Sequence, residues 1–206
     1  MEDVLDVYQR PYDPKRPLVC LDETNRQLTL ETRPCLPAKP GESKRVDYEY
    51  KRNGVVHLFR MFAPLEAKRH VRVSDQRARV DFAACIKELV DIHYPEAEKI
   101  VLVMDNLNTH SIGSLYEAFE PAEARRLARK LEIHHTPKHG SWLNMAEIEI
   151  GVLSRQALSD YVATKELMTA RVAAWQAHRN AAGSTVDWQF TTKDARVRLK
   201  RLYPEV

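Results

Sequence analysis

The chain has 206 residues, of which 44% are hydrophobic and 30% are charged. This composition is typical of one large globular domain and excludes disordered and fibrous proteins. No apolar run approaches the roughly 18–20 residues that a membrane-spanning helix needs, and the first residues are acidic, unlike a signal peptide. The three cysteines, Cys20, Cys35 and Cys85, are too widely spaced for a disulfide framework or a zinc site. We therefore expect a cytoplasmic protein with no membrane contact.

The net charge of +3 hides an uneven distribution along the chain. Residues 39–79 hold 11 basic and 5 acidic groups, and residues 124–206 hold 14 and 8, whereas residues 80–123 hold 2 and 9. Basic segments gain affinity for phosphates by releasing counterions, so this distribution favours a nucleic-acid partner. Charged faces that contact only solvent would give the same pattern, and charge alone leaves both interpretations open.

The first sixty residues predict β-strands. Residues 17–22 form a short apolar run closed by an acid, and residues 27–31 predict a second strand. Apolar and charged residues then alternate over residues 46–58, around the pair Asn53-Gly54. An Asn-Gly pair supplies the positive φ values of a tight turn, so we expect a β-hairpin that turns at this pair.

The remainder of the chain predicts helices that alternate with two further strands. The strands are residues 100–104, the most hydrophobic stretch of the chain, and residues 131–135. The expected helices are 77–93, 113–130, 142–158 with Ser141 as its N-cap, and 165–182. This order of elements predicts a mixed α/β fold with a single sheet.

Two of the expected apolar strands end in an aspartate. Asp22 closes the first strand, and Asp105 follows residues 100–104. Ligands of open α/β sheets bind beyond the carboxyl ends of the strands, so the two carboxylates converge if their strands are neighbours. The alternative is that each aspartate only caps a turn.

A third carboxylate follows a glycine turn, near the start of an expected helix. Glu147 and Glu149 both qualify, but side chains two positions apart on a helix point about 200° away from each other. Periodicity alone does not choose between them. Three carboxylates fit Mg²⁺ or Mn²⁺ better than zinc. The rival is a histidine metal site drawn from His110, His134, His135 and His139, which the spacing disfavours.

Three blocks of the sequence resemble the catalytic domain of the insertion-sequence-630 family of bacterial transposases, which are distant relatives of the mariner elements. The blocks are residues 20–28, 104–110 and 136–147, and the last two contain the patterns Asp-Asn-x-x-x-His and Ser-x-Leu-Asn-x-x-Glu. The likeness extends over about residues 17–204. It implies an α/β fold with a ribonuclease-H-like mixed β-sheet flanked by helices. It also implies an Asp-Asp-Glu (DDE) triad that falls on Asp22, Asp105 and Glu147.

The resemblance implies metal-dependent cleavage and strand transfer of DNA, with two Mg²⁺ or Mn²⁺ ions bound by the triad. It places a lead-in segment at 1–16, the catalytic domain at 17–190 and a basic C-terminal tail at 191–206. Support for Asp105 is expected from Asn106, Asn108 and His110. Contacts with DNA phosphates are expected from Lys138, His139, Lys193, Arg196, Arg198, Lys200 and Arg201.

Full-length members of the family carry an N-terminal helix-turn-helix region that reads the transposon ends, and the resemblance begins just before the first catalytic strand. We therefore expect two partners: DNA, and a transposase polypeptide that bears a helix-turn-helix. A homodimer on DNA, associated with the bacterial nucleoid, is consistent with the same resemblance. The alternatives are a nuclease of the same fold that only hydrolyses DNA and a truncated fragment without catalytic activity.

Overall fold

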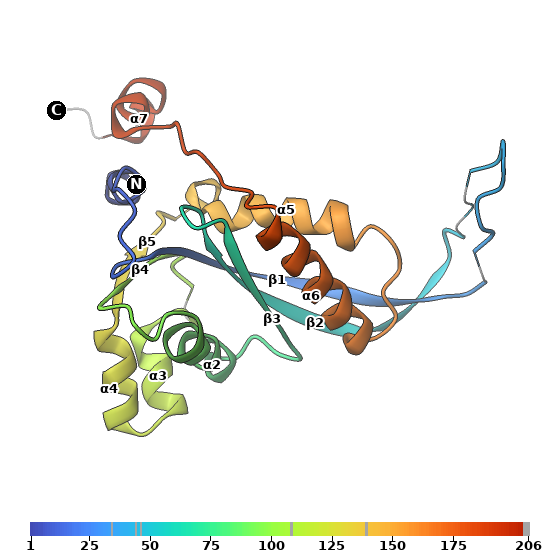
Figure 1. The fold of residues 1–206 in the computed structure, drawn as a ribbon, viewed down its shortest axis with the longest axis horizontal. Helices are drawn as coiled ribbons and strands as arrows, with labels where there is room; N and C mark the ends of the chain where they lie inside the picture. The colour runs from blue at the N-terminus through green and yellow to red at the C-terminus, as the bar shows by residue number, and fades with distance from the viewer. Residues whose placement is uncertain (34, 44, 46, 108, 139, 204–206) are drawn as a thin grey trace.

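The computed structural model describes residues 1–33, 35–43, 45, 47–107, 109–138 and 140–203, and its centre is a five-stranded mixed sheet in the order β3-β2-β1-β4-β5. β2 runs antiparallel to both β1 and β3, whereas β4 and β5 run parallel to β1. Figure 1 shows this arrangement. The strands are β1 (Leu18–Glu31), β2 (Tyr50–Ala63), β3 (Lys68–Ser74), β4 (Ile100–Met104) and β5 (Leu131–His135).

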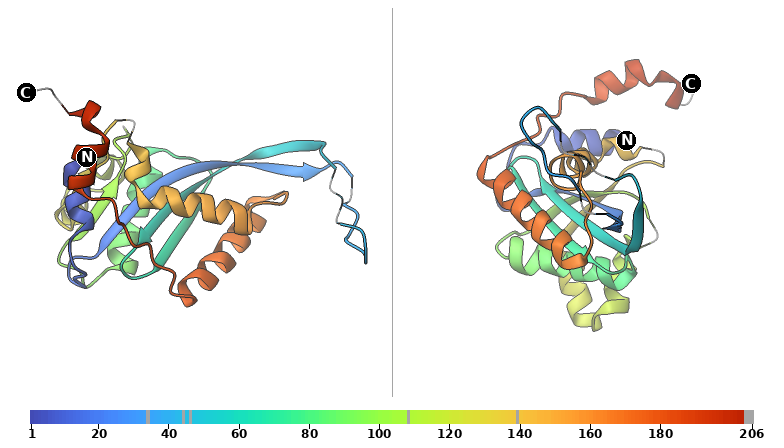
Figure 2. Two further views of the ribbon diagram at one scale, coloured as in Figure 1. Left: turned by 90° about the horizontal axis from the view of Figure 1, so that it is seen from above. Right: turned by 90° about the vertical axis from the view of Figure 1, so that its right-hand side faces the viewer.

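Helices cover both faces of the sheet (Figures 1 and 2). One face carries α2 (Arg79–Glu88) with the π-helical turn Leu89–His93, α3 (Ile112–Ala118) and α4 (Pro121–Arg129). The other face carries α1 (Glu2–Tyr8), α5 (Met145–Ala157), α6 (Lys165–Ala181) and α7 (Thr192–Arg198). Short 3₁₀ turns lie at Ser141–Leu143 and Lys200–Leu202. The far ends of β1 and β2 extend beyond the helices as a two-stranded arm.

Strand alternation divides the apolar side chains between the two faces. Successive residues of a strand point to opposite faces, so Leu21 and Met61 enter the core under α2, whereas Cys20 and Phe62 enter the core under α1 and α5. All five residues of β4 are buried, because both faces of this strand are covered. The same alternation places Asp22, two residues after Cys20, on the face that α5 covers.

Asp22 and Asp105 lie on neighbouring strands. β1 and β4 are paired in parallel, with Leu18 opposite Val101 and Cys20 opposite Val103. Asp22, two residues after Cys20, therefore lies beside Asp105, two residues after Val103. The expectation that Asp22 closes its strand is wrong, because pairing with β2 continues β1 to Glu31. The expected strands at 100–104 and 131–135 and the helix at 165–182 are confirmed to within a residue.

The predicted hairpin at Asn53-Gly54 is wrong. β2 runs straight through this pair, and residues 27–31 are the continuation of β1 rather than a separate strand; residue 46 lies outside the described part of the chain. Gln27 pairs with Val55 and Thr29 pairs with Arg52, so β2 holds one extra residue at this point. The positive φ of Gly54, 96°, serves this β-bulge instead of a chain reversal.

Two predicted helices have different bounds in the structure. The helix expected at 113–130 is interrupted between α3 and α4, because Pro121 starts a new helix and lacks the N–H that would continue the old one. The helix expected from Ser141 begins only at Met145, with Asn144 as its N-cap. Ser141 instead starts the short 3₁₀ turn that precedes it.

The two ends of the chain pack against each other. Arg196 of α7 donates hydrogen bonds of 2.7 and 2.8 Å to the carboxylate of Glu2 in α1, and the Thr192 hydroxyl bonds to Asp6 at 2.8 Å. Figure 1 shows α1 and α7 side by side. Within the residues that the structure describes, no helix combines the length and the apolar character needed to cross a membrane.

Candidate active site

Three acidic residues lie near one another where β4 ends beside β1. Asp22 is in β1, Asp105 directly follows β4, and Glu147 lies in the first turn of α5. Burial raises the pKa of Asp22 to about 6; the positive charge of Arg60 opposes this rise, and the negative charges of Asp105 and Glu147 add to it. The structure thus brings the three carboxylates predicted from the sequence within electrostatic range of one another.

The three carboxylates do not form a closed metal-binding cage. Across the described residues, no group of three or more His, Cys, Asp or Glu side chains is arranged to hold a metal ion. Of the rival histidine site this covers His110, His134 and His135, because His139 lies outside the described residues. Like charges repel, and Asp105 turns one oxygen to His110. The donor set still fits Mg²⁺ or Mn²⁺ in its chemistry, because both ions prefer carboxylate oxygens.

His110 connects Asp105 to a second acid. It is buried, and its Nδ1 donates to Oδ1 of Asp105 at 2.5 Å, while its Nε2 lies 3.5 Å from Oε2 of the buried Glu23. Burial alone would lower the pKa of His110, but the two carboxylates outweigh it and raise the pKa to about 9. His110 is therefore a cation at neutral pH that fixes the orientation of Asp105. Sequence reasoning identified His110 but missed Glu23.

The main chain around Asp105 is held from β5. His135 donates from Nδ1 to the carbonyl oxygen of Asp105 at 3.1 Å, and the Thr136 amide donates to the carbonyl oxygen of Met104 at 2.9 Å. Asn106 is exposed beside Asp105, and Asn108 lies outside the described residues. Contacts with β5 and the residue after it thus fix the main chain of Asp105, independently of the bond that His110 makes to the Asp105 side chain.

Asn144 anchors the start of α5 to β1. Its Oδ1 accepts a hydrogen bond of 3.1 Å from the Ala146 amide, and its Nδ2 donates to the carbonyl oxygen of Leu21 at 2.8 Å. Leu21 immediately precedes Asp22, so one side chain fixes the helix that carries Glu147 relative to the strand that carries Asp22. Sequence reasoning missed this role, although an Asn that precedes the first turn of a helix is an N-cap signal.

Glu147 and Glu149 have different environments. Glu149 is buried and receives hydrogen bonds from Arg69 at 2.6 and 3.0 Å and from Arg179 at 3.2 Å. Glu147 is exposed at the start of the same helix. The buried glutamate is engaged by two arginines, whereas the exposed one acts electrostatically on Asp22.

The expected DNA-contacting residues fall into two groups. Lys138 is exposed and lines a hollow of about 330 Å³ together with Asp105, Asn106 and Ser141, whereas His139 lies outside the described residues. The second group lies on α7 and the 3₁₀ turn after it. All five residues are exposed; Arg196 forms an ion pair with Glu2, and the others are Lys193, Arg198, Lys200 and Arg201.

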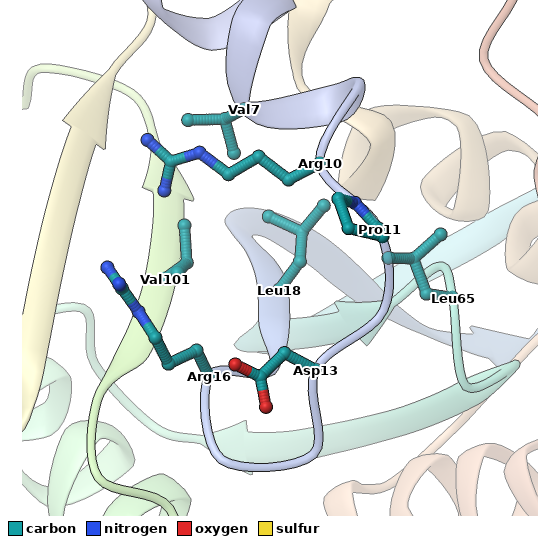
Figure 3. Close-up of a pocket in the computed structure, with 8 residues that line it drawn as sticks. All are labelled: Val7, Arg10, Pro11, Asp13, Arg16, Leu18, Leu65 and Val101. Carbon is teal, nitrogen blue, oxygen red and sulfur yellow. The ribbon is translucent and has the colours of Figure 1, made fainter.

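A separate cavity of about 340 Å³ lies at the opposite ends of the same strands (Figure 3). Leu18 and Val101, at the beginnings of β1 and β4, line it together with Arg10 and Arg16. Both arginines form ion pairs with the single carboxylate of Glu132, and Asp13 also lines the cavity. The cavity lies at the start of β1 and β4 and is therefore remote from Asp22 and Asp105.

The amino-acid sequence matches the family described as DDE superfamily endonuclease over residues 17–169, which is most of the chain. The chain belongs to this family. No curated protein matches the sequence.

Solved structures with a similar fold are those of a transposase. A crystal structure of the Mos1 mariner paired end complex with Mn has a TM-score of 0.58 and 14% sequence identity to this DDE endonuclease domain, and the match covers 88% of this chain and 55% of that one. A Mos1 transposase paired-end complex with the left transposon end has a TM-score of 0.59 and 13% identity, and the match covers 88% of this chain and 56% of that one. The crystal structure of the Mos1 strand transfer complex has a TM-score of 0.58 and 12% identity, and the match covers 88% of this chain and 54% of that one.

These matches confirm the predicted fold class. The mixed sheet flanked by helices is the ribonuclease-H-like catalytic fold seen in the Mos1 transposase structures. The chain spans about 55% of the length of the first of these proteins.

Proposed function

We propose that this DDE endonuclease domain is the catalytic domain of a transposase of the insertion-sequence-630 family, which cuts DNA strands and joins them to a target. One observation carries the proposal: Asp22 of β1 lies beside the end of the parallel strand β4, which Asp105 follows, and Asn144 anchors the helix of Glu147 to the residue that precedes Asp22. The likeness to Mos1 structures solved with a transposon end supports DNA as the partner. The proposed catalytic unit is 17–190, with 1–16 and 191–206 as flanking segments.

Asp22, Asp105 and Glu147 are the residues that would hold two Mg²⁺ or Mn²⁺ ions. When bound, the ions supply activation of the attacking oxygen and stabilisation of the negative charge on the leaving oxygen. Asp22 lies within range of both other acids and is the residue suited to serve both ions. His110 binds one oxygen of Asp105 and limits the rotation of its carboxylate.

The hollow beside Asp105 suits the sugar-phosphate backbone. Lys138 places a positive charge at its wall, and Asn106 and Ser141 add polar groups that can bond to phosphate oxygens. The exposed basic residues of α7 and its following turn would contact phosphates farther along the DNA. Such contacts position a duplex but do not read its sequence.

Recognition of the transposon ends would come from a helix-turn-helix polypeptide that acts with this domain, in an assembly that includes a second copy of the chain. The packing of the described helices favours recognition by a separate polypeptide, because α2 to α6 bury their apolar faces on the sheet of this domain. A competition experiment with terminal-repeat and scrambled duplexes at one salt concentration should show little preference by this chain alone. Strong preference would place the recognition surface within residues 1–206.

The catalytic proposal is tested with a supercoiled plasmid and with an oligonucleotide that ends in a free 3′-hydroxyl, in Mg²⁺ or Mn²⁺. Asp105→Asn and Glu147→Gln should each abolish nicking and strand joining, because each removes an ionic ligand while nearly keeping its shape. Glu166→Gln is the matched control, since Glu166 is also exposed in the first turn of a helix. Full activity of Asp105→Asn would refute the triad.

The products of the same assay separate the other functions. Nicking without joined product would identify a nuclease that only hydrolyses DNA. Absence of both products in the folded, metal-loaded chain would identify a fragment without catalytic activity.

A further inference from the structure

Arg60 is a buried cation without a hydrogen-bond partner. Its side chain lies in β2 and is only 2% exposed, and none of its three guanidinium nitrogens has a partner among the described residues. Arg69, on the adjacent strand, is equally buried but bonds to Glu149 and to main-chain oxygens. An unpaired buried charge is costly, so Arg60 must be compensated through its electrostatic surroundings.

Arg60 lies directly beside Asp22. The two residues are opposite each other in the antiparallel pair of β1 and β2, and strand alternation places both side chains on the face that α5 covers. The next pair along the strands, Cys20 and Phe62, lies in the core on that same face. Arg60 thus lies beneath the carboxylate site, enclosed between the sheet and the helix of Glu147.

The charges around Arg60 come from two elements. Asp22 of β1 and Glu147 and Glu149 of α5 act on it as anions, and Arg26 of β1 acts on it as a cation. Glu149 is already neutralised by Arg69 and Arg179, which leaves Asp22 and Glu147 as the anions that Arg60 balances. Burial lowers the pKa of Arg60 to about 10, so the guanidinium remains charged at neutral pH.

We propose that Arg60 is a positioning residue that supplies a fixed positive charge beneath the carboxylate site and holds Asp22 and Glu147 together when no metal ion is bound. A guanidinium needs no hydrogen bond for this purpose, because its charge acts strongly over several ångströms in a poorly solvated interior. Its burial prevents it from reaching a phosphate of DNA. The purpose of this charge rests on the proposed function, in which Asp22 and Glu147 are metal-binding acids.

The first test measures stability in urea, in EDTA, so that no metal contributes. Asp22→Asn has two opposite effects on stability: it removes the cost of burying the Asp22 carboxylate, and it removes the counter-charge of Arg60. In an Arg60→Met background only the first effect remains, so Asp22→Asn should raise the folding equilibrium constant about tenfold more there than in the wild type. In an Arg60→Lys background it should act as in the wild type. If Arg60→Met does not fold, Arg60→Gln takes its place in the comparison. The same effect of Asp22→Asn with and without the charge at position 60 would overturn the proposal.

The second test measures Mn²⁺ binding to the full chain by electron paramagnetic resonance. Removal of a fixed positive charge should tighten Mn²⁺ binding about tenfold in Arg60→Met, and Arg60→Lys should restore the wild-type affinity. Unchanged or weaker binding in a folded Arg60→Met protein would overturn the proposal.

The two proposals fail in different ways. If Asp105→Asn still cleaves DNA, the proposed function fails whatever the urea experiment shows. If Asp105→Asn abolishes cleavage but Asp22→Asn changes the stability of the metal-free protein equally with and without the charge at position 60, only the role of Arg60 fails.

Discussion

Arg69 donates two hydrogen bonds to the carboxylate of Glu149, at 2.6 and 3.0 Å, and both side chains are buried. Arg69 is on β3 and Glu149 is on α5, so this ion pair joins the outer strand of the sheet to the helix that carries Glu147. Asn180 of α6 exchanges hydrogen bonds of 2.9 and 3.0 Å with the main chain of Arg69. The position of the proposed catalytic helix therefore depends on residues far from the carboxylates.

Glu149→Gln should destabilise the protein by about 3–5 kcal/mol, because it leaves the buried Arg69 and the partly buried Arg179 without their shared anion. The measurement is urea unfolding in EDTA at pH 7. Glu147→Gln, two residues earlier on the same helix, is the matched control and should change stability by less than about 0.5 kcal/mol, since Glu147 is exposed. Equal effects of the two substitutions would contradict the structural role of Glu149.

Asn144→Ala should lower the free energy of unfolding by about 2 kcal/mol, because α5 loses its N-cap and the carbonyl group of Leu21 loses its hydrogen-bond donor. Cleavage should also fall, by up to about a hundredfold, because Glu147 is no longer fixed relative to Asp22. Thr164→Ala removes the N-cap of α6 and should affect stability but not the rate per folded molecule. A comparison of the two variants in unfolding and nicking assays separates positioning from stability; equal nicking rates would disprove the positioning role of Asn144.

Acid should destabilise the protein through His70, whose ring stacks on that of His93 with 3.5 Å between ring centroids. Burial, with smaller contributions from His93 and Lys68, lowers the pKa of His70 to about 4 in the folded protein. Because this value is below the ordinary pKa of about 6.5, the unfolded chain takes up the proton first. Neutral His70 makes its full contribution to the free energy of unfolding above pH 6.5, and this contribution is lost as the pH falls to about 4.

His70→Gln should therefore reduce the loss of unfolding free energy between pH 7 and pH 4 by about 2 kcal/mol, a figure that allows for partial exposure of the ring. Urea unfolding at several pH values measures this slope. His178→Gln, at an exposed position of α6, is the control and should leave the slope unchanged. The same slope in His70→Gln and in the wild type would exclude His70 as the acid-sensitive group.

DNA binding should depend on salt through the exposed basic residues after Thr192. Substitution by Gln of Lys193, Arg198, Lys200 and Arg201 should flatten the plot of log affinity against log salt, by roughly 0.9 for each phosphate that the protein no longer neutralises. Arg125→Gln with Arg129→Gln, on α4 at the opposite side of the sheet, is the control (Figure 1). If the α4 substitutions flatten the plot and the α7 substitutions do not, the binding face has been misplaced.

Arg196 is expected to behave differently from its neighbours. Its guanidinium is bound to Glu2, so Arg196→Gln should loosen the contact between α1 and α7 more than it changes the salt dependence. Amide hydrogen exchange in α1 measures this loosening.

The sequence alone determined the features that depend on local pattern. The apolar run that becomes β4 was recognisable because a strand covered on both faces needs continuous apolar residues, and Asp105 stands where that run stops. Hydrophobic periodicity located α6, and a glycine marked its end. Where a local signal had two possible uses it failed: Asn53-Gly54 supplies a positive φ, but only the pairing partner decides between a turn and a bulge.

Only the tertiary structure decided the electrostatics of the site. Arg60 and Arg69 are charged residues of strands and would ordinarily be expected in solvent, yet both lie inside because α5 covers their face. Likewise, the difference between Glu147 and Glu149 arises from contact with β3 and α6. The physical reason is that burial and Coulomb energy depend on distances between side chains that are far apart in sequence, and strand register and helix packing set those distances.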